Sequence, residues 1–295
     1  MQVAGGEAAV PSERDVCDAG GAHTEALLVI EPGKRGVREE LNDLLHFRDL
    51  LYFLVRRDLS LRYKQTLLGA MWAVVQPLMT MVVFSVFLGR LAGIPSDDIP
   101  YPVFAYLGLL PWTYFAGAVT RCSGSLVANA TLLGKVYFPR ILFPMSAALS
   151  ALVDYLIAAT VLVGLMFWYG IVPAPAMLVY IPLTILTAVL ALGVGMWLAS
   201  INIQFRDVQQ AVPFLMQIWM FATPIVYPNS IVPERFRLLF ELNPMAGIIG
   251  AYRASALGRP IDWHAIGISA AVALAVVLVA WWRFRATERH FADIV

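Results

Sequence analysis

The sequence has 295 residues, of which 60% are hydrophobic and only 14% are charged. Soluble domains carry about a quarter of charged residues, so this composition excludes an ordinary soluble protein and indicates an integral membrane protein. The net charge is +1, and no module interleaves basic with aromatic residues, so no nucleic-acid partner is predicted. Two cysteines, Cys17 and Cys122, are too few for a disulfide framework, and their spacing matches no metal site.

Residues 1–37 are predicted to form a disordered cytoplasmic tail. The first part of this stretch is rich in Gly, Ala and acidic residues and has neither helical nor strand periodicity. Across 39–55, apolar residues recur on one side of a helix, at Leu41, Leu44, Leu45, Leu51 and Leu54. Cations follow this stretch. The pattern therefore predicts an amphipathic helix that lies along the inner membrane surface.

An apolar stretch at 67–88 follows the basic segment that holds Arg56, Arg57, Arg62 and Lys64. A helix of that length rises about 30 Å, the thickness of a hydrocarbon core, so it predicts the first membrane span. Further apolar stretches predict spans at 103–120, 144–168, 177–201, 208–227 and 265–282. The expected fold is an all-α integral membrane protein with six transmembrane helices.

The distribution of cations predicts the orientation of these spans. Lys and Arg collect on the cytoplasmic side of short flanking loops. With both termini inside, the inner flanks hold Arg48, Arg56, Arg57, Arg62, Lys64, Arg121, Lys135, Arg140, Arg206, Arg283, Arg285 and Arg289. The outer flanks hold fewer, namely Arg90, Arg235, Arg237, Arg253 and Arg259. The bias predicts a multi-pass protein with both termini in the cytoplasm.

Most of the outer cations lie in the segment 228–264, between the fifth and sixth spans. It contains two apolar pieces, 236–242 and 243–252, each too short to cross a bilayer. Such pieces must be sheltered by protein or line a wet cavity, so we expect short re-entrant external helices. A small folded loop on the outer surface is the alternative.

The sequence carries no motif for catalysis or for nucleotide binding. It lacks a P-loop, and the nearest approach, Leu133-Gly134-Lys135-Val136, has neither the first glycine nor the hydroxyl residue that binds magnesium. The four histidines are scattered, and hydrolase motifs are absent. We therefore predict no catalytic residue, no metal ligand and no cofactor bound by this chain.

Two acidic positions leave alternatives open. Asp97 and Asp98 could bind a metal and a sugar phosphate, as in lipid-linked glycosyltransferases, or could simply form a solvated turn. Asp154 lies within the third predicted span, where an ionisable group is costly and faces protein or water. It could serve transport, or it could make a structural hydrogen bond to a Ser or Tyr of a neighbouring span.

Aromatic residues within the spans suggest a path for sugars. Aromatic rings stack on the C–H faces of sugar rings, and more of them are present than the two interfacial belts require. We predict that the substrate channel is lined by Trp72, Trp112, Phe115, Trp219 and Tyr227. Packing within the bundle or a position in a lipid belt is the alternative for each of them.

Several motifs resemble one known family when taken together. They are Leu51-Tyr52-Phe53-Leu54-Val55-Arg56-Arg57-Asp58, Arg62-Tyr63-Lys64-Gln65, Gln76-Pro77, Leu110-Pro111-Trp112, Lys135-Val136-Tyr137-Phe138-Pro139-Arg140 and Asn243-Pro244. They resemble the membrane subunit of ABC-2-type polysaccharide exporters, and the similarity covers residues 38–295. This resemblance implies a permease of the bacterial inner membrane that exports a lipid-linked polysaccharide such as O-antigen, teichoic acid or capsule.

The resemblance also implies partners and roles. It implies a homodimer bound to two copies of a separate ATPase, which holds ATP and magnesium. The amphipathic helix, with Arg48, Arg56 and Arg57, would be a gate or interface helix. The loop after the second span would contact the ATPase through Asn129, Lys135, Val136, Tyr137 and Phe138. An exporter of a drug or small lipid and a membrane glycosyltransferase are the rival functions.

Overall fold

The computed structural model describes residues 46–64, 66, 69–97, 99–133, 138–228, 231 and 233–288, and all regular structure in this part of the chain is helical. These residues belong to the unit Arg38–Val295. The predicted tail, residues 1–37, lies outside the described residues.

Five helical segments are long and apolar enough to cross a membrane. The first, Gly69–Leu91, combines a short 3-10 turn, α3 (Trp72–Phe84) and a π-helical end (Ser85–Leu91). The others are α4 (Tyr101–Ala128), α6 (Leu142–Trp168), α7 (Tyr180–Asn202) with the 3-10 turn Pro175–Val179 before it, and α11 (Trp263–Glu288). The prediction of an all-helical fold with several helices of membrane-spanning length is thus confirmed for the described residues.

The segment predicted to be the fifth span, 208–227, differs from the others. Its helix, α8 (Val208–Phe221), is shorter than a bilayer crossing requires, because 14 residues rise only about 21 Å. Non-helical backbone continues at 222–226, and Thr223, Pro224, Ile225 and Val226 are buried there. The expected continuous span is therefore replaced by a short helix followed by sheltered irregular backbone.

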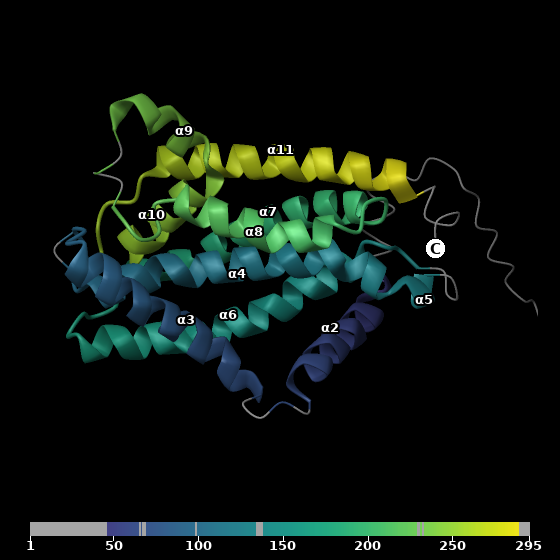
Figure 1. Ribbon diagram of the computed structural model, residues 1–295, viewed down its shortest axis with the longest axis horizontal. Coiled ribbons are helices and arrows are strands. Elements are labelled where there is room, and N and C mark those ends of the chain that lie inside the picture. The colour runs from purple at the N-terminus through teal and green to yellow at the C-terminus, as the bar shows by residue number, and fades with distance from the viewer. Residues whose placement is uncertain are drawn as a thin grey trace, which may run out of the picture. The chain divides into compact units, whose positions relative to one another are not determined.

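Shorter helices complete the chain. They are α2 (Arg48–Tyr63), α5 (Ala130–Leu133), α9 (Arg237–Leu242) and α10 (Pro244–Ala256). In Figure 1, α5 lies at one end of the bundle and α9 and α10 lie at the opposite end. The two short apolar pieces predicted after the fifth span are helical and too short to cross a membrane.

The structure moves two predicted boundaries. The amphipathic helix was expected at 39–55, but residues 39–45 are not described, and α2 continues through the basic segment to Tyr63. The second span was expected to end at Thr120, but α4 continues to Ala128. Arg121 marked a loop in the sequence, yet it stays within the helix because a carboxylate from α6 pairs with it.

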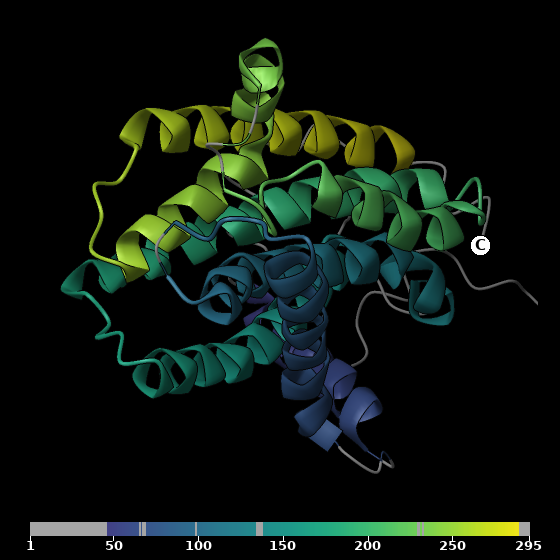
Figure 2. The same ribbon diagram turned by 60° about the vertical axis from the view of Figure 1, so that its left-hand side comes forward.

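The core of the bundle is built around α4. In an 18-residue stretch of α4, 78% of the residues are buried, against 11% in the first span and 17% in α11. Helices α3, α6, α7, α8 and α10 contact α4, whereas α11 packs on α7 and α10 (Figures 1 and 2). Helices α3 and α11 thus leave most of their surface to lipid or to another protein.

Small residues bring the inner helices close together. A Cβ atom placed on Gly195 of α7 would collide with Cys122 of α4. Gly247 of α10 packs against α11 in the same way. A Cβ atom placed on Gly247 would lie only 2.7 Å from the carbonyl oxygen of Ala265. Close backbone approach of this kind is the usual means by which helices associate in membranes.

Candidate functional site

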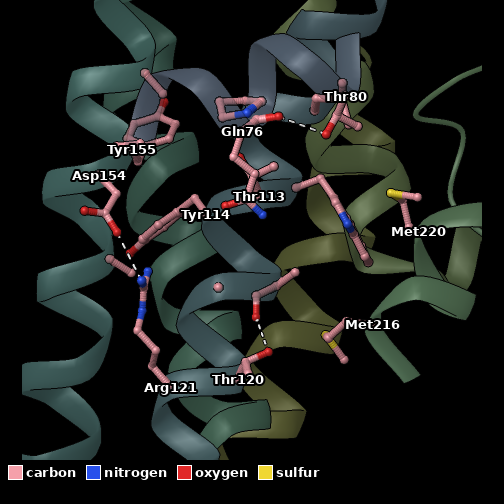
Figure 3. A pocket seen from close by; sticks show the side chains of 18 of the residues that line it. Gln76, Thr80, Thr113, Tyr114, Thr120, Arg121, Asp154, Tyr155, Met216 and Met220 are labelled. Carbon is pink, nitrogen blue, oxygen red and sulfur yellow. Dashed lines mark hydrogen bonds and ion pairs between the residues drawn. The ribbon is translucent and has the colours of Figure 1, made fainter. Parts of the chain in front are cut away.

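A cavity of about 630 Å³ opens between α3, α4, α6 and α8. Its lining includes Trp72, Gln76 and Thr80 from α3, Trp112, Thr113, Tyr114, Thr120 and Arg121 from α4, Asp154 and Tyr155 from α6, and Pro213, Met216, Gln217 and Met220 from α8. Figure 3 shows these side chains converging from several helices. The cavity therefore combines apolar rings, amides and hydroxyls with one charged edge.

The charged edge is organised by Asp154. Its Oδ2 atom accepts hydrogen bonds from Nη1 of Arg121, at 3.0 Å, and from Nη1 of Arg62. Its Oδ1 atom accepts a hydrogen bond from the hydroxyl of Tyr63. In Figure 3, Arg121 and Asp154 point toward each other from α4 and α6. The sequence left Asp154 with a transport role or a structural hydrogen bond to a Ser or Tyr of a neighbouring span; in the structure its partners are a Tyr of α2 and two arginines.

Burial, followed by the neighbouring Asp154 carboxylate, raises the pKa of the Tyr63 phenol. Tyr63 therefore stays protonated and donates its hydrogen bond. This cluster was not predicted, because Arg62 lies 92 residues before Asp154 and Arg121 was assigned to a loop. The sequence could show only that Arg62, Arg121 and Asp154 are ionisable residues within or next to apolar stretches. Their pairing depends on the packing of α2 and α4 on α6.

Helix α2 is held on the bundle by further polar contacts. The hydroxyl of Ser146 in α6 donates to Oδ2 of Asp58 at 3.0 Å. Arg57 pairs with Asp58 at 2.9 Å and donates from Nη2 to Oδ1 of Asn129 at 2.7 Å. Leu54 is buried in a cluster that includes Phe143. The contacts link α2 to α6 and to the turn between α4 and α5.

The three arginines predicted for the gate or interface helix differ in their surroundings. Arg57 is partly buried and makes the contact with Asn129, whereas Arg56 is exposed. Arg48 is also exposed and lies 3.8 Å from Asp49, a surface pair that contributes little to stability. Among these three, Arg57 is the residue that connects α2 to the rest of the bundle.

The predicted ATPase-coupling residues are described only in part. Asn129 forms the turn after α4, and its amide also donates to the Ser125 carbonyl at 2.7 Å. Phe138 is buried and packs edge-on against Phe143, with ring centroids 5.3 Å apart. Lys135, Val136 and Tyr137 lie outside the described residues.

Three of the five predicted channel aromatics contact one another. Trp219 of α8 lies edge-on to Phe115, with centroids 5.1 Å apart, and 6.2 Å from Trp112. Phe115 has no exposed surface, and Trp112 is 3% exposed. Trp112 lines the cavity, and Trp219 is partly buried beside it.

The other two predicted aromatics lie apart from this group. Trp72 is 53% exposed and lines the cavity from α3. Tyr227 follows the irregular segment after α8 and packs near Phe240 of α9, with centroids 6.4 Å apart. The structure thus places Trp72 and Trp112 on the cavity wall. That all five aromatic residues line the substrate channel stays a prediction.

The irregular backbone at 222–226 is satisfied by side chains from distant elements. Arg253 of α10 donates to the carbonyl of Pro224 at 2.8 Å and to the carbonyl of Ile225. Tyr101 donates to the carbonyl of Val226 at 2.7 Å. Non-helical backbone at membrane depth needs protein partners of this kind. From its sequence position Arg253 was predicted only as an external cation, and this role was not predicted.

Asn243, noted in the sequence beside Pro244, has a clear structural role. Its Oδ1 atom accepts from the Met245 backbone N–H and from Nε1 of Trp219, each at 3.1 Å. Its amide donates to Oγ1 of Thr223 at 2.9 Å. Asn243 is therefore the N-cap of α10, with proline at the first helical position, and it fixes α10 to the end of α8.

A second, smaller cavity of about 270 Å³ joins the loop before α4 to α10. Asp97, Phe104, Arg253 and Arg259 are among its lining residues. Arg259 donates to the backbone carbonyl of Asp97 at 2.6 Å. Asp97 adopts a positive φ of 51°, which suits a tight turn, and Asp98 lies outside the described residues.

Comparison with known proteins identifies the family. The model of the ABC-2 type transporter family matches residues 49–257. The chain belongs to the ABC-2 type transporter family. The resemblance on which the sequence analysis relied is thereby confirmed. The match covers α2, the cavity, the irregular segment and α10.

Individual relatives match over most of their length. The chain is 30% identical to an O-antigen export system permease protein RfbA of Klebsiella pneumoniae, across 84% of this chain and 95% of that protein. It is 29% identical to the RfbA protein of Myxococcus xanthus, across 86% of this chain and 98% of the relative. The polysialic acid transport protein KpsM of Escherichia coli is 26% identical across 68% of this chain and 78% of its own length.

Proposed function

We propose that this protein is the permease subunit of an ATP-driven ABC transporter that exports a cell-surface polysaccharide, carried on a lipid, across the bacterial inner membrane. The observation that carries the proposal is the match over nearly the whole length of two O-antigen export permeases. The polysialic acid transporter among the relatives supports a polysaccharide rather than a drug or small lipid.

The main cavity suits such a substrate. Its wall presents the rings of Trp72 and Trp112 together with the amides of Gln76 and Gln217. Ring stacking tolerates variation in the stacked partner, and stacking on bases, the nearest measured analogue, contributes about 1–3 kcal/mol per ring. Several weak sites of this kind let a polymer bind and still slide.

A second copy of the chain would complete the path. The cavity is bordered by α3 and α8, and both helices expose large apolar side chains, including Met79, Val83, Phe214, Ile218 and Phe221. In a membrane, apolar surface of this kind packs on lipid or on another protein, and packing on a second copy would shield the polar cavity beside it from lipid. A homodimer would bring two such cavities together.

Energy would come from two copies of a separate ATPase that hold ATP and magnesium, since this sequence contains no P-loop. The turn at Asn129, α5 and the segment with Lys135, Val136, Tyr137 and Phe138 would contact that ATPase. Arg57 joins α2 directly to Asn129, which supports joint movement of the interface helix and the coupling segment.

Six crossings, which put both termini on the same side of the membrane, are supported by the contact between Arg259 and Asp97; the distribution of cations makes that side the cytoplasm. Helices α4, α6 and α7 lie between these two residues in the chain, so α8 must also cross if both residues lie on one side. The side-chain partners of the backbone at 222–226 make that crossing possible despite the short helix.

A gene deletion tests the proposal. The deletion strain should lose surface polysaccharide and accumulate lipid-linked glycan in the inner membrane, and the full-length gene should restore export. Surface polysaccharide would be detected on intact cells, and lipid-linked glycan by mass spectrometry of membrane extracts. Normal surface polysaccharide in the deletion strain would refute the proposed function.

A further inference from the structure

The charged edge of the main cavity carries more positive than negative charge. Asp154 is shared by two guanidinium groups, those of Arg62 and Arg121. The nearest other carboxylate on α2, Asp58, is already paired with Arg57. Among these five described residues the sum is three positive charges against two negative charges. One arginine charge is therefore left without a matching carboxylate.

An unmatched charge at this position is costly. Arg121 lies within a helix that is long and apolar enough to cross the membrane, and its Nε–H is buried without a hydrogen-bond partner. Ionisable groups inside membrane segments are rare and usually mark a functional path. A structural ion pair would need one arginine, so the second arginine requires another explanation.

The position of the two arginines explains why both are present. Arg121 and Asp154 line the cavity, and their side chains are 29% and 21% exposed. Arg62 reaches the same carboxylate oxygen from the last turn of α2 and is 29% exposed. Guanidinium groups bind phosphate oxygens in paired hydrogen bonds, and a phosphate can take the place of a carboxylate in such a pair.

We propose that Arg62 and Arg121 form a binding site for a phosphate-class anion at the edge of the main cavity, where the anion replaces Asp154 as the partner of Arg62. The inference deepens the export function proposed above, because a phosphate group of the lipid-linked substrate is the occupant expected there. The rings of Trp72 and Trp112, which line the same cavity, favour a phosphate that carries an apolar group over a free inorganic anion.

Occupation of this site would also affect α2. Arg62 and Tyr63 both hold the last turn of α2 on Asp154. When an anion replaces Asp154 as the partner of Arg62, that turn keeps only the hydrogen bond from Tyr63 to Asp154. The rest of α2 stays attached through Asp58, Ser146 and Leu54. Ligand binding at the cavity would thereby loosen the end of the helix that precedes the first span.

Calorimetric titration of the purified full-length protein in detergent tests the site. The probes are inorganic phosphate, hexyl phosphate, which carries a similar charge, and, as an uncharged control, hexanol. Both phosphates should bind, hexyl phosphate more tightly, while hexanol should give no binding that depends on Arg121. Tighter binding of inorganic phosphate would still support the anion site and would assign it to a free anion rather than to a lipid phosphate.

Substitutions of opposite sign make the test specific. Arg121→Gln should weaken phosphate binding by roughly tenfold or more, since a hydrogen bond to a charged group is lost. Asp154→Asn should instead tighten binding, because the competing carboxylate is removed. Arg90→Gln is the matched control, since Arg90 is exposed at the far end of the first span, and it should leave binding unchanged.

A purely structural ion cluster would behave differently. Phosphate binding that is absent from the wild-type protein, or that is equal in Arg121→Gln and Arg90→Gln at unchanged unfolding midpoint, would overturn the proposal. If Asp154→Asn fails to fold, Arg121→Lys replaces it and should bind with intermediate affinity. The titration requires no transport, so phosphate binding in a protein whose deletion leaves surface polysaccharide intact would refute the export function and not the site.

Discussion

Individual polar side chains solve a backbone problem at the end of α8. The carbonyl groups of Ala222, Pro224, Ile225 and Val226 have no partner within a helix. Three side chains from other elements donate hydrogen bonds to them instead. Each unpaired backbone group in a membrane costs several kcal/mol. The whole free energy of unfolding of a domain is only about 5–15 kcal/mol, so few such groups are tolerated. Asn243, Arg253 and Tyr101 are therefore as necessary to this segment as apolar packing is to the helices.

Asn243→Ala should destabilise the protein by roughly 1–3 kcal/mol, because the cap of α10 and the partner of the Trp219 indole are lost together. The thermal unfolding midpoint of the purified protein measures the loss. Asn243→Asp keeps both accepted hydrogen bonds and loses the donations to Thr223 and to the Ala222 carbonyl, so its midpoint should lie between those of Asn243→Ala and the wild type. An equal loss in both variants would count against the capping role.

Aromatic residues that look alike in the sequence have different roles. Trp72→Ala should slow polysaccharide export while leaving the unfolding midpoint nearly unchanged, because Trp72 is 53% exposed on the cavity wall. Phe115→Ala should lower stability by about 3–5 kcal/mol, because Phe115 is fully buried. Trp72→Phe keeps a ring and should restore much of the export rate. If Trp72→Ala exports at the wild-type rate, the stacking role is refuted.

Between elements, the packing of α4 against α7 is set by a glycine. The Cβ of an alanine at position 195 would overlap Cys122 and also meet the Val119 carbonyl at 3.6 Å. The two helices cannot separate freely, because α6 and α11 pack on their other sides. This contact defines the spacing of the helices around the core.

Gly195→Ala should therefore destabilise the protein by roughly 1–3 kcal/mol through overpacking. Gly164→Ala is the matched control, since a Cβ there has no atom within 4 Å and the residue is also within a helix. The control should show no loss, because alanine favours helix more than glycine does. Unfolding midpoints of the two variants compare them, and an equal decrease would contradict the proposed close approach.

Helices were easier to predict from the sequence than their ends or partners. Long apolar runs located α3, α4, α6, α7 and α11 because a bilayer crossing requires a minimum length. The predicted end of α4 was wrong because a charged residue such as Arg121 indicates a loop when only the sequence is known. In the structure Arg121 pairs with Asp154 of another helix and stays within α4. Similarly, Asn243 appeared as a motif, but its partners Trp219 and Thr223 come from packing that periodicity does not encode.

For the whole molecule, the number of crossings depends on α8. Five long helices alone would put the two termini on opposite sides of the membrane, whereas a crossing at 208–227 restores them to the same side. The excess of cations in the flanks assigned to the inside favours the second arrangement. The contact between Arg259 and Asp97 favours it independently, since it joins the first external loop to the segment after α8.

Cysteine labelling decides between the two arrangements. In a background with Cys17 and Cys122 replaced, single cysteines are introduced by Asp97→Cys, Arg206→Cys and Arg259→Cys, and intact cells are treated with an impermeant thiol reagent. If α8 and its sheltered backbone cross the membrane, positions 97 and 259 should be labelled in intact cells. Position 206, in the turn between α7 and α8, should react only after the membrane is permeabilised. If positions 206 and 259 instead behave alike in intact cells, both labelled or both protected, α8 does not cross and the six-span topology fails.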